Sequence, residues 1–139
     1  MKNYTIAFLI LFTSFSACRK QSNSYIVLGK SFNLTYDEQK STSDDAISVH
    51  FKEVIEDSRC PRYVECVWEG QVKVKLRVET ENINPEDITL TYRSDNHEDI
   101  ARDTLDDMVF ILENVLPERL TLSEIPQKDY MIKMRIEEL

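Results

Sequence analysis

The sequence predicts an all-β fold, a single antiparallel β-sandwich or partly open barrel of about seven strands. Short segments rich in β-branched and aromatic residues alternate between apolar and polar positions, and turn-forming or charged residues separate them. No stretch keeps a helical apolar period. A length of 139 residues fits one domain, and 42% hydrophobic with 30% charged residues is the composition of a chain that folds.

Seven segments carry the strand pattern, and in chain order they are residues 26–28, 32–36, 47–51, 66–78, 88–92, 108–112 and 130–136. The clearest is 66–78, where one parity holds Cys66, Trp68, Gly70, Val72, Val74, Leu76 and Val78. The other parity holds the polar residues Gln71, Lys73, Lys75, Arg77 and Glu79. Because a period of two indicates a half-buried strand, we expect Trp68 on the core side beside Cys66.

The segments between the strands are predicted to be loops, because they collect turn-forming and charged residues. They are residues 39–45, 82–86 and 94–107, and Pro117 and Pro126 mark further turns near the end. Within the third loop, residues 98–107 are expected to form a turn or two of helix.

Residues 1–17 have the features of a secretory signal, with Lys2 before an apolar run too short to span a membrane. Phe15-Ser16-Ala17-Cys18 resembles a lipobox, which implies that Cys18 becomes the lipidated N-terminus. We then expect residues 18–24 to form a polar tether and residues 25–139 the β-sandwich domain. An ordinary secretory signal with a free Cys18 is the alternative, because lipoboxes usually have an aliphatic residue in place of Phe15. The predicted location is the outer membrane or another part of the cell envelope, with the lipid as the membrane contact.

The charge balance and the glycine content exclude two classes of function. Lys and Arg number 17 against 25 Asp and Glu, a net charge of −8, so we expect no nucleic-acid partner. Two glycines cannot build the glycine-rich loops that hold nucleotide phosphates, and we expect no cofactor. The composition sets no oligomeric state.

Cys60 and Cys66 are the cysteines that remain after the predicted signal and anchor. An even pair in an exported chain predicts a disulfide, because the compartments outside the cytoplasm are oxidising. A bridge this short constrains a loop rather than the whole fold.

Two surfaces are candidates for binding. The first is the bridged loop with Arg59, Arg62 and Tyr63, although the preferred interpretation of Asp57 and Arg59 is structural, as groups that fix an irregular turn. The second is a basic face, predicted from the outward parity of Lys73, Lys75, Arg77, Lys133 and Arg135. Each of the two predicted strands that hold these residues carries a stripe of basic side chains, and the stripes merge if the strands are neighbours. The simpler interpretation is that these side chains pair with acidic residues or are solvated.

Asp95, His97 and Asp99 carry ligand groups that suit a divalent cation. However, Ile100 stands where a calcium loop needs glycine and Asp106 where it needs glutamate, so no metal site is expected. No catalytic residues are assigned. A hydrolase or metal-dependent protein that uses loop carboxylates and His97 is kept as an alternative function.

The segments Glu56-Asp57-Ser58-Arg59-Cys60-Pro61 and Cys66-Val67-Trp68-Glu69-Gly70 resemble the acidic-DSRCP…CVWxG signature of small, mostly uncharacterised lipoproteins from Bacteroidetes-type bacteria. Residues 111–117 and 129–132 also resemble the endings of those proteins. Glu69 departs from the alanine that they commonly carry before the glycine. The resemblance implies a small β domain on an envelope lipid anchor and transfers no catalytic residue.

The expected function is therefore that of a lipid-anchored, non-catalytic binding domain whose partner is an envelope protein or glycan. A second alternative is an inhibitor-like module that presents the Cys60–Cys66 loop to a protease, because a rigid loop on a β-sandwich fits an active-site cleft.

Overall fold

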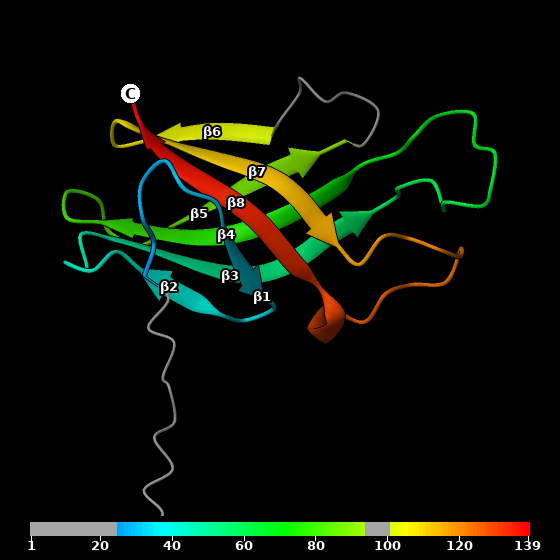
Figure 1. Cartoon of the computed structure of the whole chain (residues 1–139), viewed down its shortest axis with the longest axis horizontal. Helices are drawn as coiled ribbons and strands as arrows, with labels where there is room; N and C mark the ends of the chain where they lie inside the picture. The colour runs from blue at the N-terminus through cyan, green and yellow to red at the C-terminus, as the bar shows by residue number, and fades with distance from the viewer. Residues whose placement is uncertain (1–24, 94–100) are drawn as a thin grey trace, which may run out of the picture.

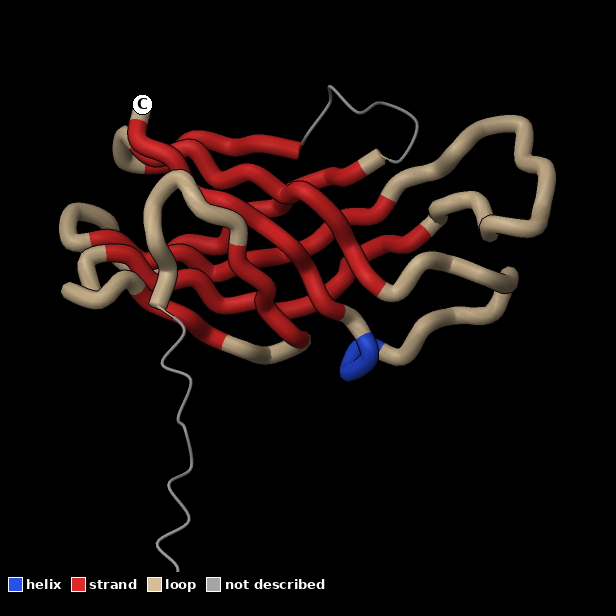
Figure 2. The backbone as a smooth tube through the Cα atoms, in the orientation of Figure 1, coloured by secondary structure: helices blue, strands red, loops and turns tan. Residues whose placement is uncertain are grey.

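A computed structural model of the chain describes residues 25–93 and 101–139, and these form a β-sandwich of two four-stranded antiparallel sheets (Figures 1 and 2). One sheet has the order β1-β8-β7-β6, with bounds Phe32–Thr35, Met131–Glu138, Met108–Leu116 and Ala101–Leu105. The other has the order β2-β3-β4-β5, with bounds Gln39–Ser41, Ile47–Asp57, Val72–Thr80 and Glu86–Tyr92. A 3₁₀ helix, η1 (Gln127–Asp129), precedes β8. The predicted all-β sandwich is confirmed, and no barrel closes among the described strands.

The core lies between the sheets and follows the predicted alternation. In β4, Val72, Val74, Leu76 and Val78 are all fully buried, and in β8 the same is true of Ile132, Met134 and Ile136. Side chains of a strand point alternately to its two faces, so each sheet lines the core with every second residue and exposes the others.

Three predictions about the strands are wrong. Residues 26–28 form a single bridge between Ile26 and Thr42 instead of a strand. The segments 39–41 and 101–105, predicted to be loop and partly helical turn, are the edge strands β2 and β6. Edge strands have few inward positions, so polar sequences such as Gln39–Ser41 carry almost no apolar alternation. These changes account for the eight strands of the described residues.

The two ends of the sandwich differ in what they carry. Ile26 pairs with Thr42 just before β3 begins, whereas residues 58–71 form a long loop after β3 ends. The 11 residues of β3 span roughly 30 Å, so the first described residues and this loop lie at opposite ends of the long axis (Figure 1). Among the described residues, no helix has the length and apolar character needed to cross a lipid bilayer.

Candidate functional site

Two long loops meet at the end of the sandwich where β3 and β7 finish (Figure 2). The first, residues 58–71, contains the two cysteines and is called the disulfide loop; the second, residues 117–126, is called the β7–β8 loop. The Arg62 backbone N–H donates to the Arg119 carbonyl at 2.9 Å, and the Arg62 guanidinium pairs with Glu118 at 3.0 Å. These contacts join the loops into one surface, which we call the loop end.

A buried ion pair lies beneath the loop end. Arg59 Nε donates to Asp57 Oδ1 at 2.8 Å, and a terminal nitrogen of the same guanidinium donates to Oδ2 at 2.6 Å. The Arg59 and Asp57 side chains are only 7% and 9% exposed. Arg59 also donates to the carbonyls of Val115 (2.6 Å) and Pro117 (3.0 Å), so one side chain ties the base of the disulfide loop to the β7–β8 loop. The planar guanidinium suits this role because its donors reach several acceptors at once.

Burial alone would raise the pKa of Asp57, but the hydrogen bonds and charge of Arg59, with the Tyr130 hydroxyl and the Arg59 N–H, hold that pKa below its usual range. The Tyr130 hydroxyl donates to Asp57 Oδ2 at 2.9 Å. Burial of this phenol and its bond to the Asp57 carboxylate raise the pKa of Tyr130 to about 12. Asp57 is therefore a buried carboxylate that stays ionised at neutral pH.

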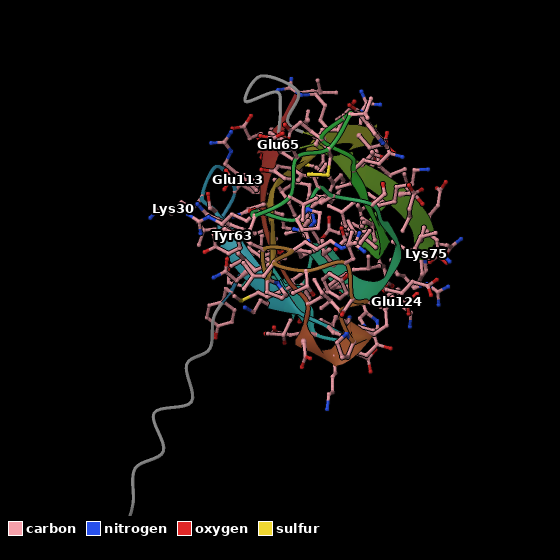
Figure 3. The ribbon with its side chains drawn as sticks, turned by 90° about the vertical axis from the view of Figure 1, so that its right-hand side faces the viewer. Lys30, Tyr63, Glu65, Lys75, Glu113 and Glu124 are labelled. Atoms are coloured by element: carbon pink, nitrogen blue, oxygen red, sulfur yellow. A yellow bond between two sulfur atoms is a disulfide. The ribbon has the colours of Figure 1, made fainter. Side chains whose placement is uncertain are left out.

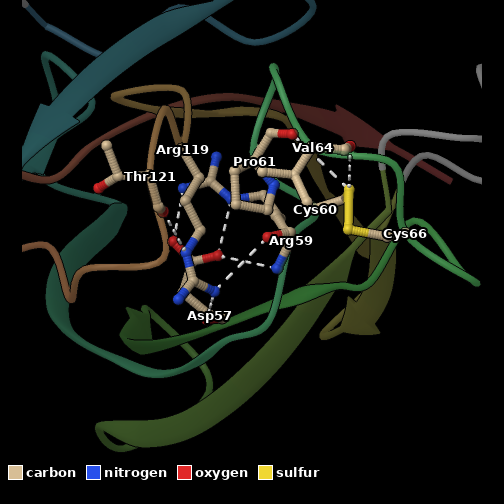
Figure 4. The surroundings of a disulfide bond; sticks show 8 residues. All are labelled: Asp57, Arg59, Cys60, Pro61, Val64, Cys66, Arg119 and Thr121. Carbon is tan, nitrogen blue, oxygen red and sulfur yellow. Dashed lines mark hydrogen bonds and ion pairs between the residues drawn. A yellow bond between two sulfur atoms is a disulfide. The ribbon is translucent and has the colours of Figure 1, made fainter.

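Arg119 holds the β7–β8 loop in shape through carbonyl groups (Figure 4). One terminal nitrogen of its guanidinium donates to the Asp57 carbonyl at 2.7 Å, the other to the Leu122 carbonyl at 3.1 Å, and Nε to the Thr121 carbonyl at 3.2 Å. Because these donors are occupied by backbone, Arg119 is a structural residue.

The predicted disulfide between Cys60 and Cys66 is present, with Cα atoms 5.9 Å apart. Within the bridged segment the Val64 N–H donates to the Pro61 carbonyl at 3.0 Å, which closes a β-turn around Arg62 and Tyr63. At the base, the Cys60 N–H donates to the Glu69 carbonyl and the Ser58 N–H to the Gln71 carbonyl, both at 2.8 Å. The disulfide loop is therefore held by hydrogen bonds at its base and by a covalent bond and a β-turn in its bridged segment.

Gly70 is required where the disulfide loop returns to β4. It has a φ of +73°, and a Cβ at this position would overlap the Ser58 carbonyl. Only glycine, which has no Cβ, adopts the left-handed conformation readily and leaves room for the Ser58 carbonyl.

The tips of both loops expose large apolar side chains. The disulfide loop contributes four, of which Tyr63 is 80% and Val67 fully exposed, and the β7–β8 loop contributes two; the set is Tyr63, Val64, Val67, Trp68, Leu120 and Leu122. Figure 3, which looks onto this end, shows Tyr63 and Glu65 at its surface. The prediction that Trp68 packs in the core is wrong: it is 56% exposed, because β4 begins at Val72 and residues before it leave the sheet.

The structure divides the predicted binding loop. Arg62 and Tyr63 are exposed at the turn, whereas Arg59 is buried and cannot contact a partner, so its assignment as a binding residue is wrong. The structural interpretation of Asp57 and Arg59 is confirmed, since the Arg59 N–H donates to Asp57 Oδ1 at 3.2 Å. Sequence reasoning did not single out Leu120 and Leu122 as surface residues. The available signal was that two leucines stand in a segment that Pro117 and Pro126 mark as a loop, where apolar side chains are exposed.

The basic stripes do not merge, because β4 and β8 belong to different sheets and their outer faces point in opposite directions. On β4, Lys73 pairs with Glu56 at 2.8 Å and Arg77 with Asp87 at 2.7 Å, and Lys75 pairs with Glu53. On β8, Lys133 lies 3.4 Å from Glu113, and Arg135 lies 3.0 Å from Glu137. The prediction of a merged basic face is thus wrong, and the five basic side chains are paired with carboxylates.

The metal candidates Asp95, His97 and Asp99 lie outside the described residues. Within residues 25–93 and 101–139, no three histidine, cysteine or carboxylate side chains come together in a way that would hold a metal ion. Asp106, considered as a ligand, accepts hydrogen bonds from Thr80 and Asn82 instead.

A cleft of about 240 Å³ opens beside the loop end, between β3 and the β7–β8 loop. Apart from the exposed carboxylate of Glu124, its polar lining is already hydrogen-bonded within the protein. Gln127 donates to the Val54 carbonyl at 2.8 Å and accepts the Val54 N–H at 2.9 Å, while Asp57 and Arg119 make the contacts above. The cleft therefore offers few free polar groups to a small ligand.

The described chain is thus a disulfide-containing β-sandwich with an apolar, internally braced loop end. Neither protein-family models, nor curated proteins, nor solved structures give a match to this chain. The resemblance to small Bacteroidetes-type lipoproteins stays a prediction.

Proposed function

We propose that this protein is a lipid-anchored binding module of the cell envelope and that its loop end is the surface that contacts the partner. One observation carries the proposal: six large apolar side chains are exposed on two loops that contact each other and whose bases are fixed by a buried ion pair. Exposed apolar side chains that gather on one surface typically mark an interaction site, whereas scattered ones need no explanation.

The bracing beneath the loop end supports a binding role. A flexible loop loses conformational entropy when a partner orders it, and a pre-ordered loop avoids much of that cost. The disulfide, the Asp57–Arg59 pair and the carbonyl contacts of Arg119 all order the loops before any partner arrives. Tyr63 and Trp68 add the residue types that most often dominate binding energy at protein interfaces.

The position of the predicted anchor fits this role. The described domain begins at Tyr25, beside the bridge from Ile26 to Thr42, at the end opposite the loop end. A lipid on Cys18 would be joined to that end by the short tether of residues 18–24. The loop end would then be directed away from the membrane and accessible to a partner.

The two alternative functions have less support. A substrate-like protease inhibitor presents an extended segment, whereas the tip of the disulfide loop is a β-turn closed by the Val64–Pro61 bond. An enzyme needs several polar groups that are free to act on a substrate, whereas the polar groups of the cleft beside the loop end, apart from the Glu124 carboxylate, are occupied by internal hydrogen bonds.

The test is site-specific photo-crosslinking in cells of the native host. A photoreactive amino acid replaces Tyr63 or Leu122 at the loop end, and Val27, an exposed apolar residue at the opposite end, serves as the matched control position. We expect a discrete adduct from Tyr63 and Leu122 and none from Val27.

A second variant, Trp68→Ser/Leu122→Ser, keeps the fold because both side chains are exposed, and we expect it to abolish the adduct from Tyr63. Circular dichroism confirms folding. Adducts of equal yield from all three positions, or an adduct that survives the double variant, would contradict the proposal. A companion Cys18→Ser variant is expected to move the protein from the membrane to the soluble fraction.

A further inference from the structure

The charges around the exposed apolar side chains describe the partner more closely. We infer that the loop end, in the proposed binding function on which this inference rests, enters a concave apolar site on another protein and that basic side chains border that site. Shape, chemical character and charge each support one part of this statement.

Shape points to a concave partner. The two loops extend beyond the ends of the sheets (Figure 1), and their large apolar side chains are exposed. Val67 is fully exposed and Leu122 is 73% exposed, so these side chains project into solvent and do not line a hollow. The contact can bury them only if the partner supplies the depression.

The chemical character favours a protein over a glycan. Four of the six exposed apolar side chains are aliphatic: Val64, Val67, Leu120 and Leu122. Sugar rings need aromatic faces accompanied by free polar groups, whereas aliphatic side chains gain energy when packed against other apolar groups. A mixed aliphatic and aromatic cluster is typical of the buried centre of a protein interface.

The charge at the loop end is negative. Glu65, Glu69 and Glu124 are exposed, and within the described residues none of their side-chain carboxylates has a hydrogen bond or ion pair. The three arginines of these loops already have partners within the protein. Arg59 pairs with Asp57, Arg62 pairs with Glu118, and Arg119 donates to backbone carbonyls. The unpaired charges that the two loops themselves carry are therefore carboxylates, whereas the exposed cation Arg93 follows β5 and the exposed cation Lys128 lies in η1, beside the loops.

This charge selects among the surfaces that an apolar tip could contact. A second copy would bring the same carboxylates face to face, and an anionic lipid surface would repel them. A protein whose apolar depression is bordered by lysine or arginine gains complementary contacts at the rim while the apolar tip is buried. Rim charges of this kind chiefly set the association rate and the specificity.

The experiment uses the full-length chain in native envelopes, with the photoreactive group at Tyr63. We compare Glu65→Lys/Glu69→Lys with Glu79→Lys/Glu81→Lys, which makes the same charge change on exposed acids at the opposite end. The inference predicts that the first variant lowers the adduct yield about tenfold and that the second leaves it within about twofold of wild type. A partner peptide mapped to an apolar depression bordered by lysine or arginine, and an adduct yield that falls as salt is raised, are the further expected results.

The apolar and charged variants separate the two proposals. If Trp68→Ser/Leu122→Ser abolishes the adduct but Glu65→Lys/Glu69→Lys does not weaken it, the basic rim is refuted and the proposed binding function stands. If neither variant changes the adduct, the loop end is not the binding surface and both proposals fail. An adduct that proves to be a lipid, a glycan or a second copy of this chain overturns the inference.

Discussion

Replacing Asp57 by asparagine should destabilise the protein far more than the same change at its neighbour Glu56. In the folded protein Arg59 is nearly buried, and Asp57 is the group that compensates its charge through two hydrogen bonds. The variant leaves the guanidinium buried without a counter-charge, because asparagine keeps one acceptor oxygen beside the Val115 and Pro117 carbonyls but carries no negative charge. An uncompensated buried charge costs about 3–5 kcal/mol, so we expect a loss of roughly 3 kcal/mol or more in the free energy of unfolding at pH 7.

Glu56→Gln is the matched control. Glu56 also pairs with a cation, Lys73, but both side chains are more than a third exposed, and such pairs contribute little. Urea unfolding followed by far-UV circular dichroism measures both variants. With urea slopes of about 1–3 kcal/mol per molar, the Asp57→Asn midpoint should fall by about 1–3 M while that of Glu56→Gln stays close to wild type.

The pH dependence of the same pair has a definite sign. Because the pKa of Asp57 is lowered in the folded state, its carboxylate stabilises the fold above about pH 4, and this contribution is lost as the pH falls through the lowered pKa. The stability gap between wild type and Asp57→Asn should therefore narrow below about pH 4. Equal midpoints for Asp57→Asn and Glu56→Gln at pH 7 would refute the reasoning, because they would mean that Arg59 does not need a buried counter-charge.

Three further predictions concern the bracing of the loop end and can be checked on the same protein. The Cys60→Ser/Cys66→Ser variant should keep its far-UV spectrum and lose about 2 kcal/mol of stability in urea, because the bridge closes a short loop that other contacts also hold; a chain that no longer folds would contradict this. Gly29→Ala should cost about 1–2 kcal/mol for its positive φ alone, whereas Gly70→Ala should cost clearly more because its Cβ also overlaps a carbonyl; equal losses would show that the loop relaxes freely. The absorbance of Tyr130 should titrate near pH 12 and stability should fall as the pH rises from 10 towards 12, since the raised pKa favours the neutral phenol of the folded state; in Tyr130→Phe the late titration should be absent, and a single titration of all tyrosines near pH 10 would count against the buried hydrogen bond.

The alternation of residues along the chain predicted the fold class and most of the core. Val72 to Val78 on β4 and Ile132 to Ile136 on β8 occupy the buried parity that their sequence indicates. Burial of one face is a local property of a strand, and the pattern shows it without knowledge of the neighbours. The disulfide was equally predictable, because Cys60 and Cys66 are close in sequence and the chain has the features of an exported protein.

The same periodicity does not mark where a strand begins. Trp68 continues the parity of Val72 and Val74, yet it lies on an exposed loop because the backbone turns away at Gly70. Arg59 has no apolar character and still is buried, because Asp57, Val115 and Pro117 supply its partners. Two of these partners are more than fifty residues away in sequence, and no local pattern records them.

By itself, then, the sequence determined the β class, the inward face of the main strands and the short disulfide. The tertiary structure decided that the basic strands lie in separate sheets, that Arg59 is a buried support and that the disulfide loop contacts the β7–β8 loop, with apolar side chains exposed on both. The physical reason is the range of the interactions. Alternation and short covalent loops depend on neighbouring residues, whereas the loop end depends on hydrogen bonds and burial between segments that only the packing of two sheets brings together.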